Sequence, residues 1–247
     1  MEWRDEGVLL SMRKHGESAA IIEVFTLAHG RHLGVVRGGA SRRMAAMLQP
    51  GSQLTVAWRA RLEDQLGVFA AEPLQSRAAL LADALGLAGL NAVTAMLRIA
   101  LAERVAHPAL WQATVRLLDQ VDQAADWPVD YLRWELMLLE DLGFGLDLRQ
   151  CAVTGSRENL AFVSPRSGRA VSRDAAGAWA DRLLPLPVVL LGQGPALGRD
   201  LRDGLALTGF FLNKGLAPAM NGKSLPEARA RLIEMLGRRA QSGLPSI

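Results

Sequence analysis

Short hydrophobic stretches separated by glycine-bearing or polar turns fill the first 77 residues of the chain. This punctuation is typical of β-strands and turns rather than of long helices. We expect five strands, at residues 7–11, 19–26, 32–36, 53–62 and 66–71. Five short strands in so few residues indicate a small closed barrel, and their number fits the five-stranded OB type.

The strand at residues 53–62 alternates most regularly between hydrophobic and polar positions. One face carries Leu54, Val56, Trp58, Ala60 and Leu62, and the other carries Thr55, Arg59 and Arg61. Because successive side chains of a strand point to opposite faces, the first set is expected in the core, Trp58 included. Of the two aromatic residues that could stack on a nucleic-acid base, Trp58 is therefore the weaker candidate. Phe25 shares its parity with Glu23 and is the better one.

From residue 76 onward, the hydrophobic positions recur at helical spacing. Helices are expected at residues 78–102, 109–124, 128–142, 194–213 and 225–241, with His107-Pro108 marking the end of the first helical stretch. Around Cys151 the helical pattern lapses. The pattern predicts an α+β multidomain protein, with an OB-fold domain at 1–77, a helical domain at 78–247 and a loop-rich insert at about 146–187.

The composition favours a folded, globular chain, since 50% of the residues are hydrophobic and 21% are charged. Asp83, Asn91 and Arg98 interrupt the longest hydrophobic region, so we interpret it as a buried helix and expect no membrane contact. A single cysteine excludes an internal disulfide framework. The charged N-terminus precedes no signal-like hydrophobic run. We therefore expect a cytoplasmic protein.

Positive charge is concentrated in the predicted barrel. The whole chain has a net charge of only +3, but residues 10–62 hold eight basic residues against two acidic ones. The basic residues are Arg13, Lys14, Arg31, Arg37, Arg42, Arg43, Arg59 and Arg61. They could form a phosphate-binding groove or a solvated face that keeps the protein soluble. The Gly38-Gly39 loop favours binding, because glycines let the backbone approach a ligand closely.

Catalytic and phosphate-loop motifs are incomplete. The run from Ser11 to Lys14 matches part of a serine acyl-enzyme signature but lacks its companion elements. The segment Gly222-Lys223-Ser224 lacks the first glycine and the preceding strand of a phosphate-binding loop. An enzyme is therefore the least favoured class.

The alternative to a nucleic-acid-binding protein is an adaptor whose helical body binds other proteins. In this reading the helix at 109–124 and the basic C-terminal helix receive an acidic peptide tail. The basic residues of that C-terminal helix are Arg229, Arg231, Arg238 and Arg239.

Several segments, in order, resemble the N-terminal OB domain of the RecO family of DNA repair proteins. They are Gly7-Val8-Leu9-Leu10, His15-Gly16-Glu17-Ser18, Phe25-Thr26, Gly30-Arg31 and Gly38-Gly39-Ala40-Ser41-Arg42-Arg43. The stretch at 135–144, then Leu146-Asp147-Leu148 and Cys151, resembles the family's passage from its last central helix into an insert.

The resemblance implies a DNA repair and recombination mediator without catalytic turnover. Such a protein binds single- and double-stranded DNA, anneals complementary strands, and acts with RecR to help RecA replace single-stranded-DNA-binding protein. It implies a cytoplasmic, nucleoid-associated location. It also implies that the DNA contacts come from the eight basic residues of the barrel named above.

Zinc-bearing members of that family have two C-x-x-C pairs in the insert. The corresponding positions here are Cys151 with Thr154 and Ser172 with Ala175. A structural zinc site needs four ligands, so we predict an insert without metal and a protein without a cofactor. Packing of four hydrophobic residues is expected to hold the insert together: Val153, Phe162, Val171 and Trp179.

Overall fold

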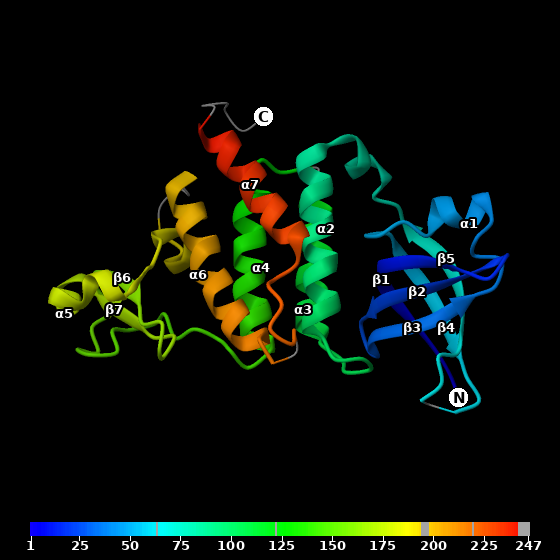
Figure 1. Ribbon diagram of the computed structural model, residues 1–247, viewed down its shortest axis with the longest axis horizontal. Coiled ribbons are helices and arrows are strands. Elements are labelled where there is room, and N and C mark those ends of the chain that lie inside the picture. The colour runs from blue at the N-terminus through cyan, green and yellow to red at the C-terminus, as the bar shows by residue number, and fades with distance from the viewer. Residues whose placement is uncertain (63, 122, 194–197, 219, 242–247) are drawn as a thin grey trace. The chain divides into compact units, whose positions relative to one another are not determined.

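A computed structural model describes the chain apart from residues 63, 122, 194–197, 219 and 242–247 (Figure 1). It divides into two compact units, Met1–Gln123 and Ala124–Ile247. Among the described residues, none of the helices is both long and apolar enough to span a bilayer.

Five strands of the first unit form a closed barrel in the order β1-β2-β3-β5-β4. The strands are β1 (Glu2–His15), β2 (Ala19–Thr26), β3 (Gly30–Val36), β4 (Gln53–Arg59) and β5 (Val68–Gln75). Only β3 and β5 pair in parallel, and helix α1 (Arg42–Met47) lies between β3 and β4 in the chain. This is the connectivity of an OB fold, so the predicted five-stranded OB-like architecture is confirmed.

The interior of the barrel is filled by side chains from all five strands and from Leu48, just after α1. Its buried members are Leu9, Ile22, Val24, Val36, Leu48, Leu54, Val56, Trp58 and Phe69. Trp58 is 1% exposed and its indole Nε1 donates a hydrogen bond to the Leu66 carbonyl at 3.1 Å, which confirms its predicted core role. The prediction for Leu62 is wrong: β4 ends at Arg59, and Leu62 lies exposed in the following loop.

Strand β2 is buried on both faces, because its outer side lies against helices of the same unit. The Glu23 carboxylate accepts a hydrogen bond from Arg98 at 2.6 Å, and Trp111 donates one to the Phe25 carbonyl at 3.0 Å. Phe25 is fully buried. The prediction that Phe25 stacks on a base is therefore wrong: it shares the outward parity of Glu23, but helices cover that side.

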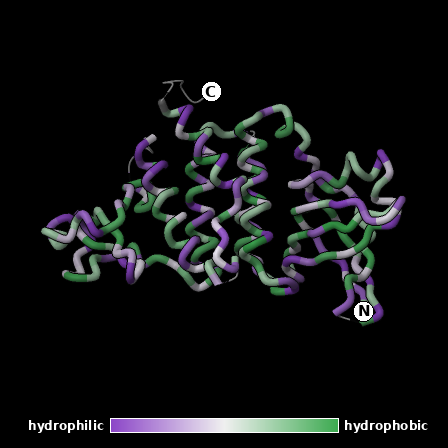
Figure 2. The backbone as a smooth tube through the Cα atoms, in the orientation of Figure 1, coloured by the Kyte–Doolittle hydropathy of each residue, from purple (hydrophilic) through white to green (hydrophobic). Residues whose placement is uncertain are grey.

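The predicted helix at 78–102 is divided at Asp83. A 3₁₀ helix, Ala78–Ala82, precedes α2 (Ala84–Ala100), whose hydrophobic character is visible in Figure 2. The Asp83 carboxylate caps α2 by accepting hydrogen bonds from the amides of Leu85 and Gly86 at 3.2 and 2.8 Å. A side chain that satisfies these end amides favours a helix start at this position. Helix α3 (Pro108–Gln120) begins at the proline that was expected to separate the two helices.

Arg77 ties the barrel to α3. Its guanidinium is buried and donates to the Gly51 carbonyl at 2.7 Å and to the Asp119 carboxylate at 2.5 Å. Together with a longer hydrogen bond to the Gln53 side chain at 3.5 Å, these bonds partly compensate the removal of this charge from water, although the buried Nε has no hydrogen-bond partner.

In the described part of the second unit, three long helices are the main elements. They are α4 (Trp127–Asp141), α6 (Gly198–Leu216) and α7 (Glu227–Gln241). The start of the helix expected at 194–213 falls on residues 194–197, which lie outside the described residues.

A buried ion pair joins α4 to α7. Arg229 donates from Nε and Nη2 to the two carboxylate oxygens of Glu135 at 2.6 and 2.9 Å, and from Nη2 to the Leu205 carbonyl at 2.7 Å. Burial alone would lower the pKa of Arg229, but the Glu135 carboxylate outweighs it and raises that pKa. Arg229 is therefore not available to receive an acidic peptide, which corrects that part of the adaptor hypothesis.

The described segment between α4 and α6 forms a small sheet in the order β7-β6-β8, with one short α-helix and two 3₁₀ helices. Its elements are β6 (Leu160–Val163), β7 (Ala170–Ser172), α5 (Arg173–Ala176), a 3₁₀ helix Gly177–Arg182, β8 (Leu184–Pro185) and a 3₁₀ helix Val188–Leu191.

The predicted packing of this insert is partly wrong. Val171 is buried and Phe162 is half-buried, but Val153 is 71% exposed and Trp179 is 62% exposed. Trp179 lies in a 3₁₀ helix on the surface, where the Arg182 guanidinium covers its ring at 4.8 Å. Shorter side chains occupy the interior of the insert instead: Leu160, Val163, Ala170 and Ala176 are buried.

Candidate nucleic-acid interface

Three hollows on the β4–β5 side of the barrel share lining residues and so adjoin one another; together they are called the arginine groove. The central hollow, of about 630 Å³, lies between the start of β1, strands β4 and β5, and the segment after β3. It shares Arg37, Met44 and Ala71 with a second hollow of about 700 Å³. At its other end it shares Glu2 and Val68 with a third hollow of about 600 Å³.

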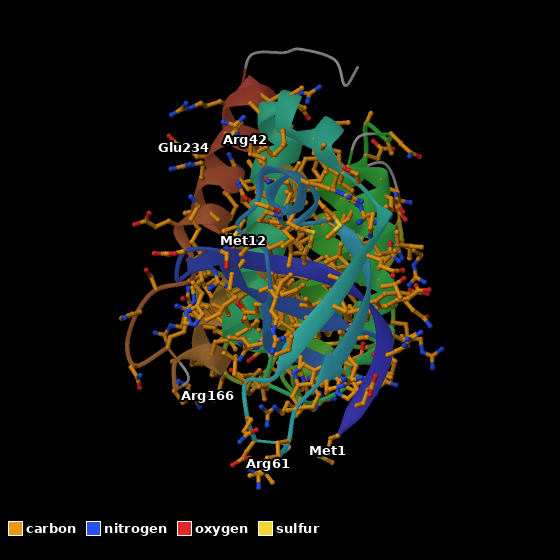
Figure 3. The ribbon with its side chains drawn as sticks, turned by 90° about the vertical axis from the view of Figure 1, so that its right-hand side faces the viewer. Met1, Met12, Arg42, Arg61, Arg166 and Glu234 are labelled. Atoms are coloured by element: carbon orange, nitrogen blue, oxygen red, sulfur yellow. The ribbon has the colours of Figure 1, made fainter. Side chains whose placement is uncertain are left out.

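Five arginines line this groove: Arg4, Arg37, Arg43, Arg59 and Arg61. Figure 3 views the barrel with β4 and β5 in front, with Arg42 on α1 at one end and Arg61 beyond β4 at the other. Arg42 is exposed at the first position of α1, next to the groove-lining Arg43. Repeated guanidinium groups along a hollow create a positive potential that attracts phosphates.

Local structure explains how these side chains reach the surface. Arg59 follows Trp58 in β4, so it points outward when Trp58 points into the core. Gly38 has a positive φ of 69°, which lets the chain turn directly after Arg37 and enter α1. The Ser41 hydroxyl caps α1 by accepting a hydrogen bond from the Met44 amide at 3.4 Å, and this places Arg43 in the first helical turn.

Arg4 was missed by the sequence reasoning, which counted charges only from residue 10 onward. The sequence did contain a signal for it: the hydrophobic Trp3 is followed by the charged Arg4, the same alternation that marks β4. Arg4 pairs with Ala57 in the register of β1 and β4, and it lines the central hollow.

One acidic residue accompanies the arginines of the central hollow. The Glu2 carboxylate accepts hydrogen bonds from Arg59 at 3.0 and 3.2 Å, and both side chains are largely exposed. An ion pair in such contact with water contributes only about 0–1 kcal/mol. A phosphate can therefore compete with Glu2 for this guanidinium.

The other predicted site residues do not lie in the groove. Arg13 and Lys14 are exposed near the end of β1 and line none of the three hollows. Arg31 is part of an internal network: it is paired with the Glu23 carboxylate, and its Nε donates to the Leu101 carbonyl at 2.8 Å. The groove thus brings together Arg37, Arg43, Arg59 and Arg61, with Arg42 beside them.

Glu23 is the centre of that internal network. Burial alone would raise the pKa of its carboxyl group, but hydrogen bonds from Arg98 and Arg31 outweigh burial and hold the pKa below its ordinary value. The Ser11 hydroxyl adds a further hydrogen bond at 3.0 Å. Arg31 therefore stabilises the buried Glu23 carboxylate, and this structural role takes the place of the predicted contact with a DNA phosphate.

The insert does not fit a structural zinc ion. The thiol Sγ of Cys151 accepts a hydrogen bond from the Ser172 amide at 3.3 Å, and the Ser172 hydroxyl accepts one from Ala175. Burial alone would raise the thiol pKa, but hydrogen bonds from Ser172 and Thr154 lower it to about 6. One sulfur with hydroxyl neighbours does not supply the four ligands that zinc needs. Among the described residues, no three His, Cys, Asp or Glu side chains gather at metal-binding distance.

Two family models match the chain. Residues 1–77 match the N-terminal domain of recombination protein O, and residues 81–224 match its C-terminal domain. The DNA repair protein RecO of Cereibacter sphaeroides is 66% identical over 96% of this chain and 99% of its own length. The RecO proteins of Roseobacter denitrificans and Paracoccus denitrificans are 58% and 56% identical, over 97% and 96% of this chain and 100% and 96% of their own lengths. The chain therefore belongs to the RecO family of DNA repair proteins.

Proposed function

We propose that this protein is a recombination mediator that binds single- and double-stranded DNA and anneals complementary strands in the cytoplasm, at the nucleoid. The observation that carries the proposal is the row of three adjoining hollows lined by five arginines on one side of an OB-like barrel. Membership of the RecO family supports it. The activity needs no catalytic turnover, because annealing is a change of pairing and not of covalent bonds.

The groove would act through the phosphates. Each phosphate that a guanidinium neutralises releases condensed counterions, so binding is expected to be tolerant of sequence and sensitive to salt. Neutralising the backbones of two strands lowers their mutual repulsion and leaves their bases free to pair. The proposal extends to partners: together with RecR, the protein would help RecA replace single-stranded-DNA-binding protein.

Charge reversal tests the proposal. Arg42→Glu and Arg43→Glu together should weaken binding and slow the annealing of complementary strands precoated with single-stranded-DNA-binding protein. The slope of log affinity against log salt should fall by roughly one unit for each lost phosphate contact. Arg116→Glu is the control for charge reversal away from the groove, with one reversed charge instead of two, since Arg116 is exposed on α3 and lines none of the three hollows.

An unchanged salt slope in the double variant would remove the α1 end of the groove from the binding surface. A loss of equal size in the Arg116 variant would show that binding follows overall charge and not this groove. No measurable binding of either DNA form by the unaltered protein, even at low salt, would refute the proposal.

A further inference from the structure

The centre of the arginine groove has an apolar floor made of small side chains. Ala57 of β4 and Ala70 of β5 are direct partners in the register, and Arg4 of β1 is the next residue along the same row. Residues opposite one another in paired strands point to the same face, so the two alanines stand side by side between the arginines. Val68 and Met44, both half-buried, continue this apolar floor on either side.

We infer that the Ala57–Ala70 floor is a seat for the unpaired bases of a single DNA strand, with the guanidinium groups around it holding the phosphates. This rests on the proposed function and specifies it. The two alanines would then determine which form of DNA the groove prefers, because their small side chains leave the room in which bases lie.

Duplex DNA has no use for such a floor. Its bases are stacked and paired inside the helix, and it presents mainly phosphates and sugars to a basic groove. Placing charged phosphates on an apolar surface removes them from water without a compensating hydrogen bond. An unpaired base, in contrast, has an apolar face that gains free energy when contact with hydrophobic side chains removes it from water.

Three DNA probes with the same number of phosphates separate base contacts from backbone contacts. They are an oligothymidylate, a fully abasic strand and a hairpin duplex. The unaltered protein should bind the oligothymidylate about tenfold more tightly than the abasic strand, because only the first can bury the apolar faces of bases on the floor.

The test variant is Ala57→Ile/Ala70→Ile, which fills the centre of the groove and removes no charge. Its affinity for oligothymidylate should fall to that for the abasic strand, while its affinity for the abasic strand and for the duplex changes less than about twofold. The salt slope should stay the same, since every phosphate contact is retained.

Two controls guard against a folding defect. Thr55→Ile places the same side chain on the exposed face of β4, one row from Ala57; Thr55 lines none of the three hollows, although its partner Glu72 on β5 lines the second, and the variant should leave all three affinities unchanged. The single variant Ala70→Ile alters only an exposed position and should show the same loss in smaller measure. Circular dichroism during heating reports whether each variant is folded.

Equal affinity of the unaltered protein for oligothymidylate and the abasic strand would overturn the seat but leave the proposed function standing. A parallel loss of all three probes in the alanine variants, or an equal loss in Thr55→Ile, would also overturn it. Failure of the unaltered protein to bind any of the probes would refute the proposed function itself.

Discussion

Arg229 is the most informative residue for testing the energetics of the second unit. We consider the substitution Arg229→Met, which keeps much of the side chain's length and removes its charge. In the unaltered protein the Arg229 and Glu135 side chains are 8% and 0% exposed, and the guanidinium also binds the Leu205 carbonyl at 2.7 Å. The variant would leave the Glu135 carboxylate buried without its counter-charge.

The expected loss of unfolding free energy is about 3–5 kcal/mol, the range for removing one partner of a buried ion pair. The double variant Glu135→Leu/Arg229→Met should recover most of this loss, because no isolated charge is then buried. Thr208, whose hydroxyl lies 2.5 Å from Glu135, keeps the Gly204 carbonyl at 3.2 Å as an acceptor.

Equilibrium unfolding in urea at pH 7 measures these free energies. Arg231→Met is the matched control on the same helix: Arg231 is exposed, so the change should be within about 0.5 kcal/mol. A loss below about 1 kcal/mol in Arg229→Met would refute the reasoning. The reasoning would also be refuted if the double variant lost as much unfolding free energy as Glu135→Leu and Arg229→Met lose in sum when each is made alone.

Three further predictions concern stability. Burial, with the nearby Arg104 charge, lowers the pKa of His32 to about 4, so the neutral imidazole is favoured in the folded state. The free energy of unfolding should therefore fall by up to about 3 kcal/mol from pH 7 to pH 4. His32→Phe should reduce this pH dependence, as measured by unfolding in urea. Gly30→Ala should lower the free energy of unfolding far more than Gly38→Ala, for which the loss is about 1 kcal/mol. Both glycines have a positive φ, but only at Gly30 would an added Cβ lie 1.9 Å from the Val105 carbonyl oxygen. A chelator should leave the Tm unchanged, since the insert offers only the Cys151 sulfur; a fall of several degrees would reveal a metal that contributes to folding.

The barrel was predictable because its core positions alternate along the sequence. Leu54, Val56 and Trp58 lie inside as expected, since period-two alternation reports which face of a strand is buried. The charged first half of β1 was missed, because Glu2 to Glu6 contains too few hydrophobic residues to be recognised as a strand. Pairing with β4 brings these residues into the sheet, and pairing between distant segments cannot be read from local pattern.

The fate of individual side chains was less predictable. Phe25 has the parity of an outward residue, but helices more than 60 positions later in the chain cover it. Arg31 and Arg59 are the same residue type in two strands that follow one another along the chain, and only the fold shows that Arg31 is tied to Glu23 and Leu101 while Arg59 stays at the surface. Charge counting finds the basic region; long-range contacts decide which arginines remain free to bind.

The hydrogen-bonded Cys151–Ser172 contact affects how the insert withstands oxidising conditions. Peroxides that damage DNA also attack zinc-bound thiolates and release the metal, which unfolds the domain that depended on it. In this insert Cys151 is 1% exposed, and this burial limits the contact of its sulfur with peroxide, although hydrogen bonds from Ser172 and Thr154 lower its pKa to about 6 and so favour the thiolate that peroxide attacks. The insert would therefore keep its shape during the same chemical stress that creates the lesions needing repair.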